Sequence, residues 1–221
     1  MADKEILIFV EGPSDKVFLE AYLYFLEDIP IKNFKVKDVT GKDNLSKRLL
    51  EIEKYDKTLI IFDADKDYES NKKEILSKTQ QKITEEQIFL FPNNQDDGDL
   101  ETLLLEIAKH DEFLKCFEGY LECIKSKEHY KPIKNISKSK WYAYLEVFEL
   151  QNFFKDKRNK NDKKNEEKII IDDKGKIRKE YKEEYEKLKE VIDFNSNSLI
   201  PLKNFLERFA KNNQKTNPKI F

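Results

Sequence analysis

The first half of the chain alternates between short apolar runs and segments with apolar residues at helical spacing. Continuous apolar runs at 6–10, 58–62 and 88–91 predict strands that are buried on both faces. The alternating segment 34–39 predicts a further strand. Helical spacing occurs at 14–25, 45–55, 72–82 and 100–108. This alternation predicts an α/β fold with a four-stranded, mainly parallel sheet flanked by helices.

The second half of the chain has a different pattern. Its helical segments are 112–125, 137–154, 179–192 and 199–209. Residues 155–168 are almost devoid of apolar side chains and predict an exposed loop, whereas 169–171 predicts a short strand. We expect residues 1–110 to form the α/β core. We expect residues 111–221 to form a mostly helical, Lys-rich region packed on that core.

Charge is distributed unevenly along this pattern. Residues 1–110 carry 24 acidic and 16 basic side chains, whereas the remaining residues carry 20 and 26. The basic excess lies mainly in residues 125–164, with 12 basic against 5 acidic side chains. Such an asymmetry is typical of a metal site beside a surface that binds a polyanion. A solvated Lys-rich helix or loop would give the same counts.

The sequence also excludes several classes of protein. No apolar run approaches the roughly 18–20 residues of a membrane helix, and the run at 6–10 is too short for a signal peptide. The 2 histidines are too few for a His-rich metal site. The 2 cysteines, Cys116 and Cys123, are expected to be reduced thiols. We therefore expect a cytoplasmic protein with no membrane association.

Acidic residues follow three of the predicted strands at the point where each strand ends, and two of these strand ends carry the leading candidates. Glu11 follows the first strand, and Asp63 and Asp65 follow a later one. The carboxyl ends of parallel strands meet at one edge of a sheet, so these side chains are expected to lie close together. Crowded carboxylates repel one another unless a cation neutralises them, and oxygen ligands select hard ions such as Mg²⁺. The sequence therefore predicts a metal site at this edge.

Further acidic residues are second-rank ligands at the same edge. Asp15 lies one helical turn beyond Glu11, Asp67 lies two residues beyond Asp65, and Glu101 opens the helix after the fourth predicted strand. Near this last position are also Asp96, Asp97 and Asp99. A single acidic residue after a strand is usually a turn former or a helix N-cap, so each of these has a structural interpretation as well.

Two short motifs occur in a fixed order at this edge, Glu11-Gly12 after the first strand and Asp63-Ala64-Asp65 after a later one. With these motifs the first half of the chain resembles the Toprim (topoisomerase–primase) domain, whose fold is a Rossmann-like sheet. Gly41, in the turn after the second strand, matches the small-residue turn of Toprim proteins. Asp15 and the acidic residue that opens the last helix of the core make the chain similar to small stand-alone Toprim proteins and to overcoming-lysogenization-defect (OLD) nucleases.

The resemblance implies phosphodiester chemistry that depends on Mg²⁺ or Mn²⁺. One or two ions would be held by Glu11, Asp63 and Asp65, with help from the second-rank carboxylates. The signature Glu11 can alternatively act as general acid or base. OLD-type nucleases also use a lysine beyond the core, for which the candidates are Lys138 and Lys140, and Lys140 would neutralise charge in the transition state. Because this chain carries no ATPase domain, a partner protein is expected to supply ATPase or helicase function.

The basic region also carries candidates for contacts with DNA or RNA. Basic side chains bind phosphates, and neighbouring aromatic side chains can stack on unpaired bases. The candidates for nucleic-acid binding are Lys138, Lys140, Lys155, Lys157 and Arg158. For the aromatics Trp141, Tyr144 and Phe148 we expect instead the core-facing side of a helix.

Three functions are consistent with these residues. The leading hypothesis is a Mg²⁺-dependent nuclease or related phosphotransfer protein, in phage defence or in DNA or RNA maintenance. The alternative is a non-catalytic Toprim module that binds nucleic acid or a partner protein. The third is a phosphatase-like enzyme on a similar sheet that acts on mononucleotides.

Overall fold

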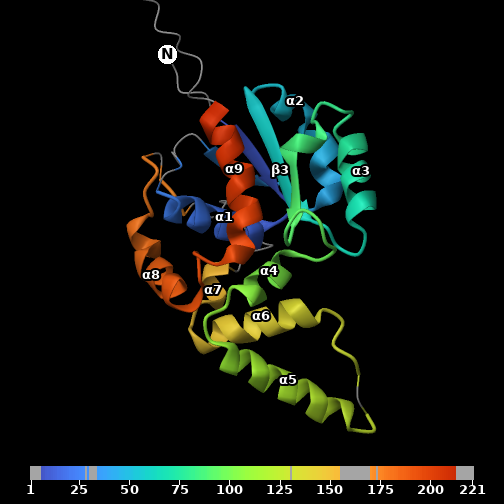
Figure 1. Ribbon diagram of the computed structural model, residues 1–221, viewed down its shortest axis with the longest axis vertical. Helices are drawn as coiled ribbons and strands as arrows, with labels where there is room; N and C mark the ends of the chain where they lie inside the picture. The colour runs from blue at the N-terminus through green and yellow to red at the C-terminus, as the bar shows by residue number, and fades with distance from the viewer. Residues whose placement is uncertain are drawn as a thin grey trace, which may run out of the picture.

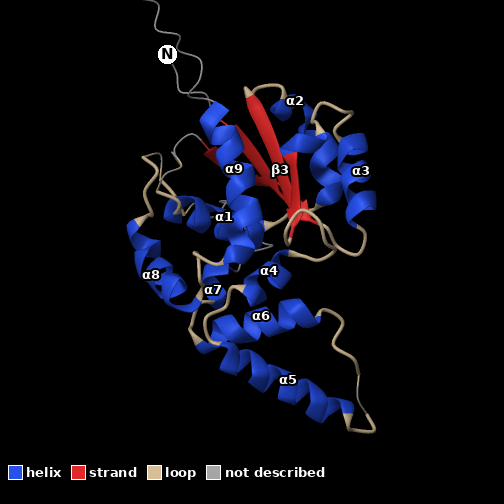
Figure 2. Cartoon of the chain, viewed as in Figure 1, coloured by secondary structure: helices blue, strands red, loops and turns tan. Residues whose placement is uncertain are grey.

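Four strands form a single sheet in which every neighbouring pair is parallel. The computed structural model describes residues 6–27, 29, 34–129, 131–154, 170–172 and 174–212. The strands are β1 (Ile6–Val10), β2 (Phe34–Asp38), β3 (Lys57–Asp63) and β4 (Ile88–Phe91). Their order across the sheet is β2-β1-β3-β4. The predicted α/β fold class is confirmed, and Figures 1 and 2 show helices on both faces of the sheet.

The apolar runs are continuous because the sheet is buried on both faces. Alternate residues of β1 enter two different cores, with Ile8 in one and Leu7 and Phe9 in the other. The same alternation holds in β3, where Ile61 and Phe62 point to opposite faces. The sequence pattern therefore reflects a three-layer arrangement of helices, sheet and helices.

Each face of the sheet is covered by its own set of helices. The larger core contains side chains of α1 (Pro13–Phe25), α4 (Leu100–Glu106) and α9 (Ile200–Asn212). The smaller core contains side chains of α2 (Leu49–Ile52) and α3 (Tyr68–Lys78). Helix α9 comes from the far end of the chain, so residues more than 100 positions from the strands complete the packing of the sheet.

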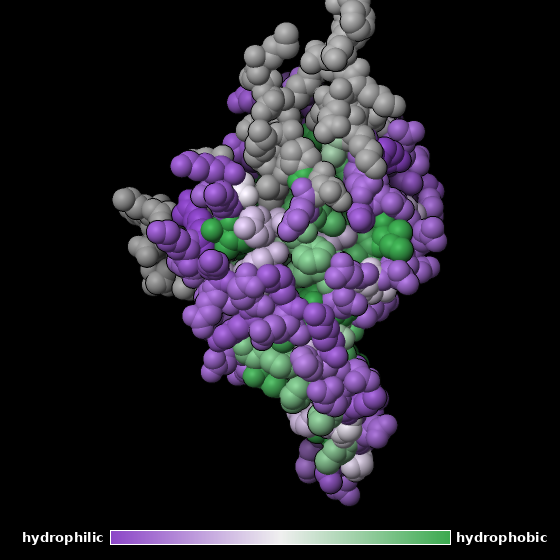
Figure 3. All heavy atoms as spheres, turned by 60° about the vertical axis from the view of Figure 1, so that its left-hand side comes forward, coloured by the Kyte–Doolittle hydropathy of each residue, from purple (hydrophilic) through white to green (hydrophobic). Residues whose placement is uncertain are grey.

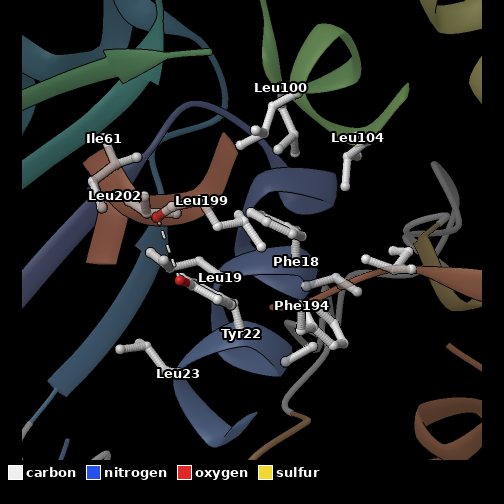
Figure 4. Close-up of a cluster of buried hydrophobic side chains, with 14 of the residues drawn as sticks. Phe18, Leu19, Tyr22, Leu23, Ile61, Leu100, Leu104, Phe194, Leu199 and Leu202 are labelled. Atoms are coloured by element: carbon white, nitrogen blue, oxygen red, sulfur yellow. Dashed lines mark hydrogen bonds between the residues drawn. The ribbon is translucent and has the colours of Figure 1, made fainter. Parts of the chain in front are cut away.

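Tyr22 lies at the centre of the larger core (Figure 4). Its ring stacks with that of Phe18 at a centroid distance of 6.0 Å and with that of Phe194 at 6.1 Å. Its hydroxyl donates to the carbonyl oxygen of Leu199 at 3.5 Å. Burial raises the pKa of Tyr22 far above its ordinary value, so the hydroxyl keeps its proton and remains a donor.

The second half of the chain is helical. It contains α5 (Asp111–Lys125), α6 (Ile136–Val147), α7 (Gln151–Phe154) and α8 (Lys182–Val191). Trp141 and Tyr144 of α6 are buried in the larger core and Phe148 packs against it, as expected for these aromatics. Helices α5 and α6 form the end of the molecule that is farthest from α9 (Figure 1). Within the described ranges, no helix combines the length and the apolar character that a membrane crossing requires.

Two predicted helices are shorter than their sequence pattern. The segment expected as a helix at 45–55 contains the end of a 3₁₀ helix, Lys42–Arg48, and only one turn of α-helix in α2. The helix expected at 137–154 is divided into α6 and α7 at Glu149, which has a φ of 59°. The left-handed residue turns the chain so that Leu150, Phe153 and Phe154 become buried, a gain in apolar burial that helical spacing does not reveal.

The strand expected at 169–171 is reduced to one residue pair in the described part of the chain. Ile171 pairs with Ile177 in an isolated antiparallel bridge. The turn between them is held by Asp172, whose Oδ1 accepts from the backbone N–H groups of Lys174 and Lys176 at 2.9 Å each. The loop expected at 155–168 lies outside the described residues.

Candidate functional site

The carboxyl edge of the sheet brings together acidic residues from four places in the chain. Glu11 directly follows β1, Asp63 is the last residue of β3, and the two strands are hydrogen-bonded neighbours. Asp15 lies in the first turn of α1 and Glu101 in the first turn of α4. Four carboxylates predicted from separate parts of the sequence therefore lie at one place in the fold.

Glu11 carries an oxygen atom with no partner. Within the described part of the chain, its Oε2 is fully enclosed and has no hydrogen-bond partner. Burial raises the pKa of Glu11; Lys42 counteracts this rise and the negative charge of Asp65 adds to it. A buried carboxylate oxygen without a partner is costly, and a bound cation would remove that cost.

Asp15 is buried near other carboxylates. Its Oδ2 accepts the backbone N–H of Gly12 at 2.7 Å, which closes the N-terminus of α1. Burial raises the pKa of Asp15 to about 7, with repulsion from Glu101 and Glu11 adding to the rise. This carboxyl therefore keeps its proton to a higher pH than an exposed aspartic acid does.

Asp63 lies at the electrostatic centre of the cluster. Burial raises its pKa well above the ordinary value, and Asp15, Glu11 and Glu101 each raise it further. Its Oδ1 accepts the backbone N–H of Leu100 at 2.9 Å, which links the end of β3 to the start of α4. The pKa of Glu101 is also raised by burial, although Lys138 counteracts the rise. These four carboxylates, Glu11, Asp15, Asp63 and Glu101, are called the carboxylate cluster from here on.

Asp65 stands at the rim of this cluster in an unusual backbone conformation. It has a φ of 54°, and its backbone exchanges two hydrogen bonds of 2.7 Å with Gly98. This bridge ties the loop after β3 to the loop before α4. Gly98 has a φ of 146°, and a Cβ there would lie 3.0 Å from Pro92, so any other residue would be strained at this position. The Asp65 side chain is held towards solvent, where 53% of it is exposed.

Lys42 is a site residue that the sequence did not reveal. Its Nζ lies 2.5 Å from Asp65 Oδ2 and 2.5 Å from Asn71 Oδ1, and its side chain is only 14% exposed. It follows Gly41, whose φ is 99° and whose backbone N–H donates to the carbonyl oxygen of Glu11 at 2.9 Å. The sequence position of Lys42 was the one signal that could have identified it, because the turn that contains Lys42 follows β2 at the same edge of the sheet as the acidic residues.

Three of the remaining acidic residues of the two loops hold backbone groups, whereas Asp96 accepts from the side-chain amide of Asn93 at 2.8 Å. Asp67 accepts from the N–H of Ser70 at 2.9 Å and caps α3. Asp99 accepts from the N–H of Thr102 at 2.8 Å and caps α4, and Asp97 accepts from the N–H of Tyr68 at 2.8 Å. Asp67 and Asp99 are therefore helix N-caps, which is the structural interpretation that the sequence allowed for acidic residues after strands.

A cavity of about 600 Å³ opens beside the carboxylate cluster. Its walls contain Asp63, Asp65, Lys66, Asp67, Ser70, Asn71, Gly98, Asp99, Glu101, Asn135 and Lys138. Lys138 Nζ lies 3.7 Å from Glu101 Oε1, whereas Lys140 Nζ lies 2.5 Å from Glu118 on α5. Of the two predicted lysines, the structure brings Lys138 to the cavity. Lys155, Lys157 and Arg158 lie outside the described residues.

The chemistry of these side chains fits a hard divalent cation. The candidate ligands are all carboxylate oxygens, their charges repel one another, and one buried oxygen in the described part of the chain has no partner. Among the described residues, however, no three Asp, Glu, His or Cys side chains are already arranged as a metal site. Lys42 holds Asp65 in the structure, so Asp65 would have to exchange this ion pair for a cation.

Comparison with known proteins gives a family and no function. The family model described as "Protein of unknown function (DUF3226)" matches residues 5–211. No curated protein matches the chain. No solved structure matches it either.

Proposed function

The chain belongs to the DUF3226 family, and we propose that it is a Mg²⁺-dependent enzyme that cleaves or transfers phosphodiesters of nucleic acid, as in Toprim-type nucleases. The observation that carries the proposal is the carboxylate cluster, in which Glu11 Oε2 is buried without a partner in the described part of the chain. Buried carboxylates that repel one another are typical of functional sites, where a bound cation or a catalytic role offsets the repulsion.

The proposed ion would be held by Glu11, Asp63 and Asp65, with Asp15 and Glu101 beside them. When bound, the ion would polarise a phosphate, lower the pKa of a water molecule and stabilise the leaving oxygen. Burial raises the pKa of Glu11, which supports a second role for this residue as general acid or base near neutral pH.

Positive side chains at the cavity support an anionic substrate. Lys138 lines the cavity and is 56% exposed, so it is free to turn from Glu101 towards a phosphate oxygen. Lys66 lines the same cavity. We assign the charge-stabilising role to Lys138 and not to Lys140, because Lys140 is paired with Glu118 on the neighbouring helix.

The test is a cleavage assay with single-stranded and double-stranded DNA and RNA in Mg²⁺ or Mn²⁺. Glu11→Gln and Asp63→Asn should each abolish cleavage, because each removes a charge from the cluster. The matched control is Asp56→Asn, which changes an exposed carboxylate just before the opposite end of β3. The proposal fails if cleavage survives both site variants or is equally lost in the control.

A second function is favoured by one observation. Lys42 pairs with Asp65 at 2.5 Å and so supplies a fixed positive charge where a metal would otherwise act. The corresponding proposal is a non-catalytic module that binds nucleic acid or a partner protein. Fluorescence anisotropy would then show nucleic-acid binding that EDTA does not change, with no turnover of any polymer. Binding that requires Mg²⁺ would argue against this second function.

A further inference from the structure

Lys42 is a lysine that the fold keeps largely from solvent. Hydrophilic side chains make up most of the surface that Figure 3 shows, and lysines ordinarily belong to such a surface. The Lys42 side chain, in contrast, is only 14% exposed. Its Nζ lies 2.5 Å from Asp65 Oδ2 and 2.5 Å from Asn71 Oδ1. A cation supplied by the chain itself therefore pairs with Asp65, one of the candidate metal ligands.

The two acceptors of Lys42 differ in how firmly the fold holds them. Asn71 lies in α3, and its side-chain amide donates to the backbone carbonyl oxygen of Ala64, which turns Oδ1 towards Lys42. The Asp65 side chain is 53% exposed and lines the cavity beside the carboxylate cluster. Asn71 is therefore a fixed neutral acceptor, whereas Asp65 is a charged acceptor that can turn to another cation.

The turn that carries Lys42 has contacts of its own. Gly41 has a φ of 99°, and its backbone N–H donates to the carbonyl oxygen of Glu11 at 2.9 Å. On the other side of Lys42, Asp43 Oδ1 lies 2.7 Å from the Nζ of Lys78 on α3. The backbone of the turn can therefore keep its place when the side chain of Lys42 moves.

An ion pair can also serve only to join two segments of a fold. The turn after β2 and the loop after β3 are already joined without this pair, because Asn71 contacts both Lys42 and the carbonyl oxygen of Ala64. The pair with Asp65 adds a positive charge beside the candidate ligands, where it counteracts the rise in the pKa of Glu11. A positive charge at this place competes with a divalent ion, because both neutralise the same carboxylates.

We propose that Lys42 is a positioning residue that acts as an internal counterion of the metal site. In the metal-free protein it holds Asp65, and a divalent ion must displace it to gain Asp65 as a ligand. The inference rests on the metal site of the proposed function. It adds that Lys42 sets the affinity of this site, since the ion pair with Asp65 is lost when the metal binds.

Binding of Mn²⁺, measured by electron paramagnetic resonance, tests this competition without any substrate. Lys42→Met keeps an unbranched side chain but removes its charge. Asp65 is then available to the ion, and Mn²⁺ should bind about tenfold more tightly than to wild type. Lys42→Arg keeps the charge and should bind Mn²⁺ no more tightly than wild type does.

The matched control is Lys66→Met, which removes an exposed positive charge from the wall of the same cavity. Loss of any nearby positive charge favours a cation, so the affinity should rise, but clearly less than in Lys42→Met. Equal gains in the two variants would overturn the inference. Equal affinities of wild type and Lys42→Met would overturn it as well and leave the metal site in place. If none of the proteins binds Mn²⁺, the inference falls together with the proposed function.

Labelling of lysine amines in the wild-type protein tests the displacement directly. Mass spectrometry would compare the rate of acetylation at Lys42 in EDTA and in saturating Mg²⁺. A buried amine in an ion pair is shielded from the reagent, so the rate at Lys42 should rise several-fold when Mg²⁺ takes Asp65 from it. The rate at Lys47, an exposed residue of the same 3₁₀ helix, should not change. An unchanged or lower rate at Lys42 in protein that has bound Mg²⁺ would show that the ion pair persists and would overturn the inference.

Discussion

At the residue scale, the carboxylate cluster is a set of charges that the fold keeps close together. Asp63 is held by one backbone hydrogen bond from Leu100, and three other carboxylates raise its pKa. Repulsion among these carboxylates lowers the stability of the metal-free protein. Functional sites commonly reduce the stability of a fold in this way.

Asp63→Asn should therefore stabilise the metal-free protein. Asparagine keeps an acceptor oxygen for the N–H of Leu100 but carries no charge, so the free energy of unfolding should rise by about 1 kcal/mol or more. Urea denaturation in EDTA measures this change. Asp56→Asn should remain within about 0.5 kcal/mol of wild type. A loss of stability in Asp63→Asn would show that its charge is paired and not repelled.

The same charges predict how stability depends on pH. Asp15 has an ordinary pKa of 3.8 and a pKa of about 7 in the folded protein, so the folded state binds a proton that the unfolded state releases. The ionised form of Asp15 lowers the free energy of unfolding. This destabilisation is absent below about pH 4, grows as the pH rises, and reaches its full size above about pH 7. Asp63, Glu11 and Glu101 shift in the same direction.

We therefore expect the free energy of unfolding in EDTA to fall between about pH 4 and pH 7, and Mg²⁺ to remove most of this fall. Denaturant titrations at a series of pH values measure it. Exposed Asp43 and Asp111 have lowered pKa values. Their contributions to the unfolding free energy therefore change at lower pH and do not overlap with the change caused by the carboxylate cluster. Stability that is constant or rises over this range would contradict the description of the cluster.

Sequence reasoning located the acids of the site and the cation Lys138, but it did not locate the cation Lys42. Glu11, Asp63 and Asp65 could be predicted because residues at the ends of parallel strands meet at one edge. Lys42 could not, because the ion pair with Asp65 depends on the conformation of the turn at Gly41, which a local pattern does not specify.

At the scale of elements, strands were easier to predict than helix ends. Runs such as 6–10 are apolar throughout because both faces of the sheet are covered, so a local pattern is enough to identify them. The end of α6 depends instead on the distant packing of Leu150 and Phe153, which outweighs the local preference for helix at Glu149.

The break between α6 and α7 gives a prediction about stability. Glu149→Gly should raise the free energy of unfolding by about 0.5–1 kcal/mol, because glycine adopts a positive φ without the clash of a Cβ. Thermal and urea denaturation measure it. The matched change Glu146→Gly, at an exposed position inside α6, should lower it by about 1 kcal/mol. Equal effects of the two variants would show that the conformation at Glu149 does not matter.

At the scale of the whole molecule, the two halves of the chain share one core. Ile8 and Ile61 of the sheet belong to the same cluster of buried residues as Trp141, Leu202 and Phe205. The sequence could not show this, because helical spacing identifies an apolar side of a helix but not the surface that it covers.

Residues 1–110 expressed alone should consequently fail to fold cooperatively. Removal of α9 and of the other helices on that face exposes one side of the sheet, and near-UV circular dichroism should show no fixed tertiary packing. In the full chain, Phe205→Ala should cost about 3–5 kcal/mol. A fragment that unfolds in a sharp transition like that of the full chain would show that the α/β core is independent.

The most direct test of the proposed metal site is anomalous scattering from crystals soaked in Mn²⁺. We predict a peak enclosed by Glu11, Asp63 and Asp65, with the side chain of Lys42 moved away from Asp65 and no peak in crystals of Glu11→Gln. A cluster without a peak, in which Lys42 still pairs with Asp65, would contradict the account.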